Sequence, residues 1–245
     1  MELSVFKTAE EAARKAAAEV AELIRENRIA IIGVSAGHTF DPFYKELVRY
    51  HKQEGIPMNK FRSFQTCEYL GLPGTHPMSK RYYLVEHFFR HVPVPRRYMR
   101  RLPGLPINME ATCKKFEQRI KSVDGINLLV LEIGKRGQLA FNEKGSPFTS
   151  RTRQVHLSSD FREEYAKDFP RGATAHRGIT MGIATILEAQ RIIVLATNAE
   201  RSEALKRMLT GPITPSCPAS ALRNHPSVTI FADQKTAGKV PTATY

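Results

Sequence analysis

The stretch LEIGKRGQLAFNEKGS, residues 131–146, runs from an apolar, strand-like segment into a loop punctuated by glycines. The loop carries one carboxylate, Glu143, close to the cations Lys135, Arg136 and Lys144. Apolar neighbours raise the pKa of a carboxyl group and nearby cations lower it. Glu143 is therefore a candidate acid or base, with a solvated turn residue as the alternative interpretation.

A second loop, residues 67–77, begins with a cysteine and a carboxylate, Cys67 and Glu68. A thiolate at Cys67 could act as a nucleophile, whereas a buried thiol would act as a small apolar side chain. The three cysteines lack CxxC spacing, which favours free thiols in a reducing, cytoplasmic compartment. The histidines form no HExxH motif, and the sequence predicts no metal site.

The segment GVSAGHT, residues 33–39, places Ser35, Gly37 and Thr39 between a predicted strand and a predicted helix. Backbone amides and a helix N-terminus in such a turn suit a phosphate group. The segment is neither a Walker loop nor GxGxxG, so it gives no support for nucleotide binding. Lys167 and Arg201 could supply balancing cations, and each taken alone could equally be a surface charge.

The elements that must position these loops alternate along the chain. Helices are predicted over 8–28, 41–55, 79–92, 111–123, 161–169, 178–189 and 200–211, and strands over 29–34, 61–66, 126–133, 152–157, 191–197 and 227–233. Continuously apolar strands separated by helices favour an α/β fold with a mostly parallel sheet covered on both faces. No linker or repeat interrupts the pattern, so we expect a single domain over residues 1–245.

Ligands of such sheets bind beyond the carboxyl ends of the strands. This rule selects the loops at 33–39, 67–77, 133–146 and 197–201, which contain the candidate residues described above.

The composition limits the partners. Of the 245 residues 42% are hydrophobic and 25% are charged, and no apolar run approaches the roughly 20 residues of a membrane span. The formal net charge of +13 favours an anionic partner, either a nucleic acid or a small molecule. The most basic stretch, VPVPRRYMRR at 92–101, is flanked by proline and lacks the motifs of nucleic-acid-binding domains. We therefore expect an anionic small molecule, and neither nucleic acid nor membrane.

Ordered segments along nearly the whole chain resemble the glucosamine-6-phosphate deaminase/isomerase family, which is related to 6-phosphogluconolactonases. They are residues 44–56, 68–92, 137–153, 178–197 and 211–233. The resemblance implies a modified Rossmann-like fold, often oligomeric, and a conversion of glucosamine 6-phosphate to fructose 6-phosphate and ammonia without a metal or cofactor. That reaction opens the sugar ring, moves a proton between C1 and C2 and expels ammonia, which are tasks for carboxylates and a histidine.

The catalytic motifs of that family are altered in this chain. The family reads F-N-M-D-E-Y where this chain reads FQTCEY, which puts Cys67 in place of the Asp base and leaves Glu68 beside it. The family reads G-N-D-G-H-I-A-F-N-E where this chain reads GKRGQLAFNE, so that Arg136 replaces an Asp and Gln138 replaces the ring-opening His. Arginine is not a base at neutral pH and glutamine shuttles no proton. Of the acid/base residues that the resemblance implies, only Glu143 is therefore kept. A Cys67 thiolate would need a strongly lowered pKa, which Arg136 could provide if the two loops meet.

The loop that the resemblance assigns to phosphate differs less from the family in its charge than the catalytic motifs do. The family's L-P-T-G-G-T-P is VSAGHTF here, which keeps Gly37 and Thr39 but substitutes Ala36 and His38. Lys167 stands where the family has a phosphate-binding Arg, and Arg201 stands near its phosphate-binding Lys.

We therefore expect a protein that binds a hexose phosphate and whose deaminase chemistry the three substitutions put in question. The alternatives are a non-catalytic phosphosugar sensor or partner subunit, and an enzyme of different chemistry, such as a lactonase-like hydrolase that uses Glu143 or Glu68.

Overall fold

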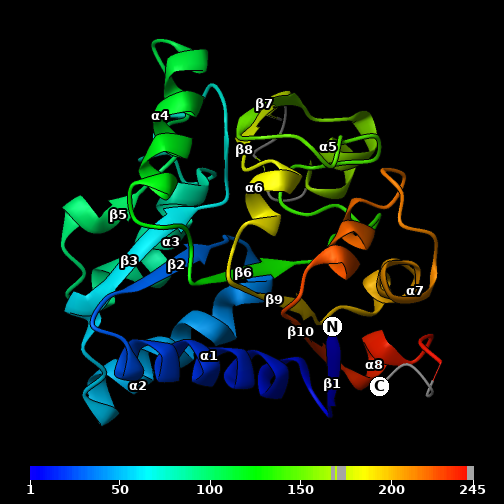
Figure 1. Cartoon of the computed structure of the whole chain (residues 1–245), viewed down its shortest axis with the longest axis horizontal. Coiled ribbons are helices and arrows are strands. Elements are labelled where there is room, and N and C mark those ends of the chain that lie inside the picture. Colours follow the sequence, from blue (N-terminus) through cyan, green and yellow to red (C-terminus); the bar gives the residue numbers. More distant parts are fainter. Residues whose placement is uncertain (167–168, 170–174, 242–245) are drawn as a thin grey trace.

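The computed structural model describes residues 1–166, 169 and 175–241, and within them a seven-stranded sheet forms the centre of the molecule (Figure 1). The order is β1-β10-β9-β6-β2-β3-β5, and every neighbouring pair is parallel. The strands are β1 (Glu2–Phe6), β2 (Ala30–Val34), β3 (Phe61–Gln65), β5 (Met99–Arg100), β6 (Leu128–Glu132), β9 (Arg191–Ala196) and β10 (Val228–Asp233). The predicted α/β fold with a mostly parallel sheet is confirmed.

The described residues also form a smaller antiparallel sheet in the order β4-β8-β7, from β4 (Cys67–Tyr69), β8 (Arg177–Thr180) and β7 (Arg153–His156). This sheet corrects the predicted helix over 178–189. Its first part is the central strand β8, and only α6 (Ile183–Leu187) is helical. The alternation of small and apolar residues from Gly178 to Met181 fits a paired strand, and partners distant in the chain decided between strand and helix.

Helices cover both faces of the central sheet. They are α1 (Ala9–Glu26), α2 (Asp41–Glu54), α3 (Lys80–His87), α4 (Met109–Lys121), α6, α7 (Ser202–Thr210) and α8 (Gln234–Ala237), whereas α5 (Ser159–Glu164) packs against the smaller sheet. Thr8 caps α1 by accepting the backbone N–H of Glu11, and Glu11 in return accepts the N–H of Lys7. The predicted helix over 79–92 is shorter in the structure, because α3 ends at His87 and a 3₁₀ turn follows.

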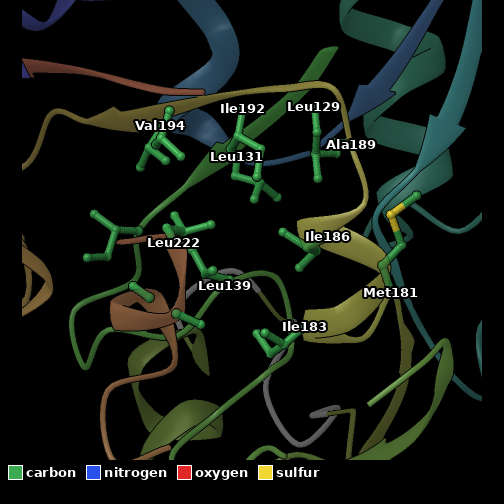
Figure 2. Packing of buried hydrophobic residues seen from close by; sticks show 14 of the residues in the cluster. Leu129, Leu131, Leu139, Met181, Ile183, Ile186, Ala189, Ile192, Val194 and Leu222 are labelled. Carbon is green, nitrogen blue, oxygen red and sulfur yellow. The ribbon is translucent and has the colours of Figure 1, made fainter. Parts of the chain in front are cut away.

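Side chains that alternate along β6 build the two halves of the core. Leu128 and Val130 pack with residues of α1 and α2, which lie along one side of the sheet in Figure 1. Leu129 and Leu131 face the other way, towards Ile183 and Ile186 of α6 (Figure 2). Leu139 belongs to this second cluster, so that the core anchors the loop after β6 and fixes the position of its polar residues.

Candidate functional site

A cleft of about 530 Å³ lies beyond the carboxyl ends of β2, β6 and β9, and this volume is typical of a small-molecule site. Each of the four loops selected from the sequence contributes to its lining. The lining includes residues 37–39 after β2, Tyr69 and residues 77–80, Glu132 and Lys135, Glu164 and Tyr165, and residues 197, 198, 200 and 201.

A second, smaller cavity of about 30 Å³, large enough for a water molecule, adjoins the cleft. Lys80, Glu132 and Tyr165 line both spaces, and we call these three residues the partition. Cys67 lines the small cavity and is not among the described residues that line the cleft. Cys67, at the position where the resemblance places the family's base, therefore faces the small cavity, which shares these three side chains with the cleft.

The Cys67 thiol is protonated at neutral pH. Burial raises its pKa to about 12, and the nearby ammonium of Lys80 only partly offsets this effect. The cation that acts on the thiol is thus Lys80, not the Arg136 suggested by the sequence. A thiol with so high a pKa supplies almost no thiolate for proton abstraction or nucleophilic attack at neutral pH.

Glu68 has a structural task. Its buried carboxylate accepts hydrogen bonds from the Ser79 hydroxyl at 2.8 Å and from the backbone N–H groups of Lys80 and Arg81, each at 2.9 Å. It also accepts from the N–H of Tyr69 at 2.8 Å. Glu68 therefore satisfies the first N–H groups of α3 and ties this helix to β4.

The altered loop after β6 folds onto itself and onto α5. The side-chain amide oxygen of Gln138 accepts the backbone N–H of Arg136 at 2.9 Å, and the Arg136 guanidinium forms a salt bridge with Glu164, also at 2.9 Å. Glu143 accepts hydrogen bonds from the backbone N–H of Ser158, at 3.1 Å, and from the Ser158 hydroxyl. Arg136, Gln138 and Glu143 are all absent from the described lining of the cleft.

The residues assigned to phosphate fall into three groups. Gly37, His38, Thr39 and Arg201 line the cleft. Ser35 and Ala36 line the small cavity, where the Ser35 hydroxyl donates to the carbonyl of Val130 at 2.9 Å. Lys167 lies outside the described residues.

Arg201 is already paired within the protein. Its Nη1 donates to a carboxylate oxygen of Glu132 at 2.8 Å and to the Thr39 hydroxyl at 3.0 Å. Burial acts to raise the pKa of Glu132, but Arg201, the Thr39 hydroxyl and Lys80 outweigh it and hold that pKa below its usual value. Glu132 is thus ionised and balances the charge of Arg201.

Sequence reasoning missed the three residues of the partition. Glu132 gave a signal, because it is the one charged residue in the apolar segment 126–133. Lys80 gave a weaker signal of a functional role, because a cation is unfavourable in the first turn of a helix. Tyr165 gave none.

The described residues contain no group of three or more His, Cys, Asp or Glu side chains that could hold a metal ion. His87 and His91 stand four residues apart, but they have other partners. His87 Nδ1 lies 3.1 Å from a carboxylate oxygen of Asp41, and His91 Nε2 lies 2.9 Å from the carbonyl of Glu86. In the same part of the chain no helix has the length and apolar character that a bilayer crossing needs.

Comparison with known proteins gives a family. A family model described as glucosamine-6-phosphate isomerases/6-phosphogluconolactonase matches residues 6–231. The chain belongs to this family. Within the glucosamine-6-phosphate isomerase/6-phosphogluconolactonase family, the chain is 37% identical over 231 residues to a glucosamine-6-phosphate deaminase of Bacillus velezensis, covering 94% of this chain and 95% of that protein. It is 36% identical to glucosamine-6-phosphate deaminase 1 of Giardia intestinalis over 228 residues, which cover 92% of this chain and 85% of that one.

Solved structures agree with the family's fold. A monomeric glucosamine-6-phosphate deaminase superposes with a TM-score of 0.95 at 32% identity, covering 98% of this chain and all of that one. A 6-phosphogluconolactonase from Trypanosoma brucei, at 17% identity and a TM-score of 0.76 over 98% of both chains, shares the fold. The family and the fold predicted from the sequence are both confirmed.

Proposed function

We propose that this member of the family binds a hexose phosphate in the cleft and does not deaminate glucosamine 6-phosphate at the rate of an ordinary enzyme. The observation that carries the proposal is the state and position of Cys67, which is protonated and lines the small cavity and not the cleft. The relatives named glucosamine-6-phosphate deaminases match nearly the whole chain, which supports a phosphosugar as the ligand.

The cleft keeps the features that bind an anionic group. The turn at 37–39 and the cations Lys80, Lys135 and Arg201 line it. A guanidinium carries five N–H donors, and the bonds of Arg201 to Glu132 and Thr39 both use Nη1. Arg201 therefore retains donors for a phosphate, in the bidentate geometry that guanidinium groups favour.

The acid/base set implied by the resemblance is not assembled at the cleft. A general base must come within hydrogen-bond reach of the proton that it removes. Among the described residues, Cys67 holds its proton, Gln138 has none to exchange, and the Glu143 carboxylate is bound to Ser158. Binding of a sugar phosphate without turnover is the behaviour of a sensor or a partner subunit, which we favour over a hydrolase of different chemistry.

The test combines turnover and binding on the same purified protein. With glucosamine 6-phosphate, we expect release of ammonia and fructose 6-phosphate below about 1 per second, the lower end of typical enzymes. Calorimetry with glucose 6-phosphate should show binding. Turnover above that rate would overturn the loss of catalysis, and failure of every hexose 6-phosphate to bind would overturn the proposed ligand.

We also propose a cytoplasmic protein, and because the family is often oligomeric, a homo-oligomer is the assembly to test for. Light scattering on the purified chain gives its mass directly, and the mass of one chain at all concentrations would contradict the oligomer.

A further inference from the structure

Lys80 is the first residue of α3, and its backbone is held firmly. Its N–H donates to Glu68 at 2.9 Å, and the preceding Ser79 caps the helix by accepting from the N–H groups of Arg81 and Tyr82. The side chain runs from this fixed base to the inner end of the cleft, where it forms part of the partition.

Lys80 differs from Arg201 and Lys135 because it has no direct carboxylate partner among the described residues, although Glu132 and Glu68 act on it from farther away. Arg201 pairs with Glu132 at 2.8 Å and Lys135 pairs with Glu200 at 3.7 Å. In the described part of the chain, no carboxylate lies within 4.0 Å of the Lys80 ammonium, and it donates no hydrogen bond to a described acceptor. Its described neighbours are rings, with Nζ at 5.1 Å from the centre of Tyr69 and 5.9 Å from that of Tyr165.

This ammonium stays charged. Burial lowers the pKa of Lys80, but the surrounding acidic groups, Tyr69 first and then Cys67, Glu132 and Glu68, raise it above its ordinary value. Aromatic faces hold a cation without neutralising it. Lys80 therefore presents three N–H donors, and no acceptor of its own, at the inner end of the cleft.

The local structure does not require a cation at this position. The N-terminus of a helix carries partial positive charge, so a lysine in the first turn of α3 is electrostatically disfavoured. Glu68 already satisfies the N–H groups there. The Lys80 ammonium has no described hydrogen-bond acceptor and lines a ligand-sized cleft, so a ligand in the cleft would supply the acceptor.

We infer that Lys80 binds the end of the ligand that points towards Cys67, and that it selects a sugar phosphate with oxygen groups there against one with an amine. This inference rests on the proposed function. A hydroxyl, carbonyl or carboxylate oxygen accepts from the ammonium, and a carboxylate adds an opposite charge. The protonated amine of an amino sugar is repelled and finds no acceptor on Lys80. The ligand class is thus a non-amino sugar phosphate, best with a carboxylate at the end remote from the phosphate.

Calorimetry at pH 7 with three probes tests the inference: 6-phosphogluconate, glucose 6-phosphate and glucosamine 6-phosphate. We expect the protein to bind 6-phosphogluconate at least about tenfold more tightly than glucosamine 6-phosphate, the order of one hydrogen bond to a charged group, with glucose 6-phosphate between them. Lys80→Met and Lys80→Gln remove the charge and should reduce this ratio to about twofold or less. Lys80→Arg keeps the charge and should preserve the order.

Lys135→Met is the matched control, because Lys135 is a cation at the same cleft with a carboxylate partner. It should weaken all three probes alike and leave their ratio unchanged. Equal affinity of the unchanged protein for the three probes, or a ratio that both neutral variants retain, would overturn the role of Lys80 and leave the proposed function intact. If neither these probes nor inorganic phosphate bind, the proposed function fails, and the inference with it.

Discussion

The carboxylate of Glu132, the last residue of β6, forms a 2.8 Å salt bridge with the guanidinium of Arg201, the residue before α7. The two side chains are 19% and 10% exposed, so that water screens the pair only weakly. The protein thus places its own anion against a cation that the family resemblance assigns to phosphate. Any anionic ligand at this point shares Arg201 with Glu132.

Glu132→Gln should therefore strengthen phosphate binding. The amide keeps the size of the side chain but releases Arg201, and we expect the affinity for inorganic phosphate to rise about tenfold, as for one gained hydrogen bond to a charged group. The melting temperature should fall, because the buried guanidinium loses its counter-charge. Calorimetry and thermal denaturation measure the two effects. Glu200→Gln, at the more exposed pair with Lys135, is the control, and a lower phosphate affinity in Glu132→Gln would contradict this account.

Cys67 should react slowly with iodoacetamide in the folded protein at pH 7.5, since its pKa near 12 leaves almost no thiolate. Cys113 is only partly buried and should be alkylated first. Mass spectrometry of peptides from folded and unfolded protein gives both rates. Faster modification of Cys67 than of Cys113 in the folded state would refute the assignment.

The same pKa makes stability depend on pH above neutrality. The folded state keeps the Cys67 proton that the unfolded chain loses above about pH 9, so the free energy of unfolding should decrease as the pH rises from 9 towards 12. Denaturant unfolding at pH 8 and pH 10 measures this decrease, which should be smaller in Cys67→Ala. Burial also raises the pKa of Tyr165, which adds to the decrease at higher pH in both proteins.

Cys67→Asp alone should not create a deaminase. The new carboxylate would be buried in the small cavity, where the Lys80 ammonium offsets only part of the cost of burial, and we expect the free energy of unfolding to fall by about 3 kcal/mol. Ammonia release from glucosamine 6-phosphate should stay at the level of the unchanged protein. Cys67→Ser is the control for size, and the appearance of turnover in Cys67→Asp would show that the partition does not separate position 67 from the sugar.

Glu143→Gln should lower stability without changing ligand affinity. Its carboxylate supports the start of α5 through Ser158, and loss of such a hydrogen bond costs about 1 kcal/mol. Ser158→Ala should act similarly, and the double variant should cost less than the sum, because both changes remove one interaction. A change in the dissociation constant for glucose 6-phosphate would place Glu143 at the ligand instead.

The sequence predicts what depends on near neighbours. The apolar run of β6 and the capping pair of Thr8 and Glu11 are local, and the structure contains both. The motif strings also identify the family. The strand β8 could not be predicted in this way, because its pairing with β4 joins residues more than 100 positions apart.

In the site, too, local features could be predicted from the sequence and long-range contacts could not. That the four loops meet follows from the rule for parallel sheets, and all contribute to the cleft. The pairing of Glu132 with Arg201 joins residues 69 positions apart, and the rings around Lys80 come from β4 and from the residue after α5. No spacing of residues in the sequence predicts such contacts, because each residue taken alone could equally be a surface charge or an aromatic residue of the core.

The partition also limits what a proton-transferring side chain introduced at position 67 could do. A carboxylate at position 67 would line the small cavity, which has room for a water molecule and not for a sugar. For a sugar to reach position 67, Lys80, Glu132 and Tyr165 would first have to be replaced by shorter residues or adopt other rotamers. Two of these three carry the charges that now shape the binding end of the cleft. Ligand binding at this end of the cleft and access to position 67 therefore depend on the same three side chains.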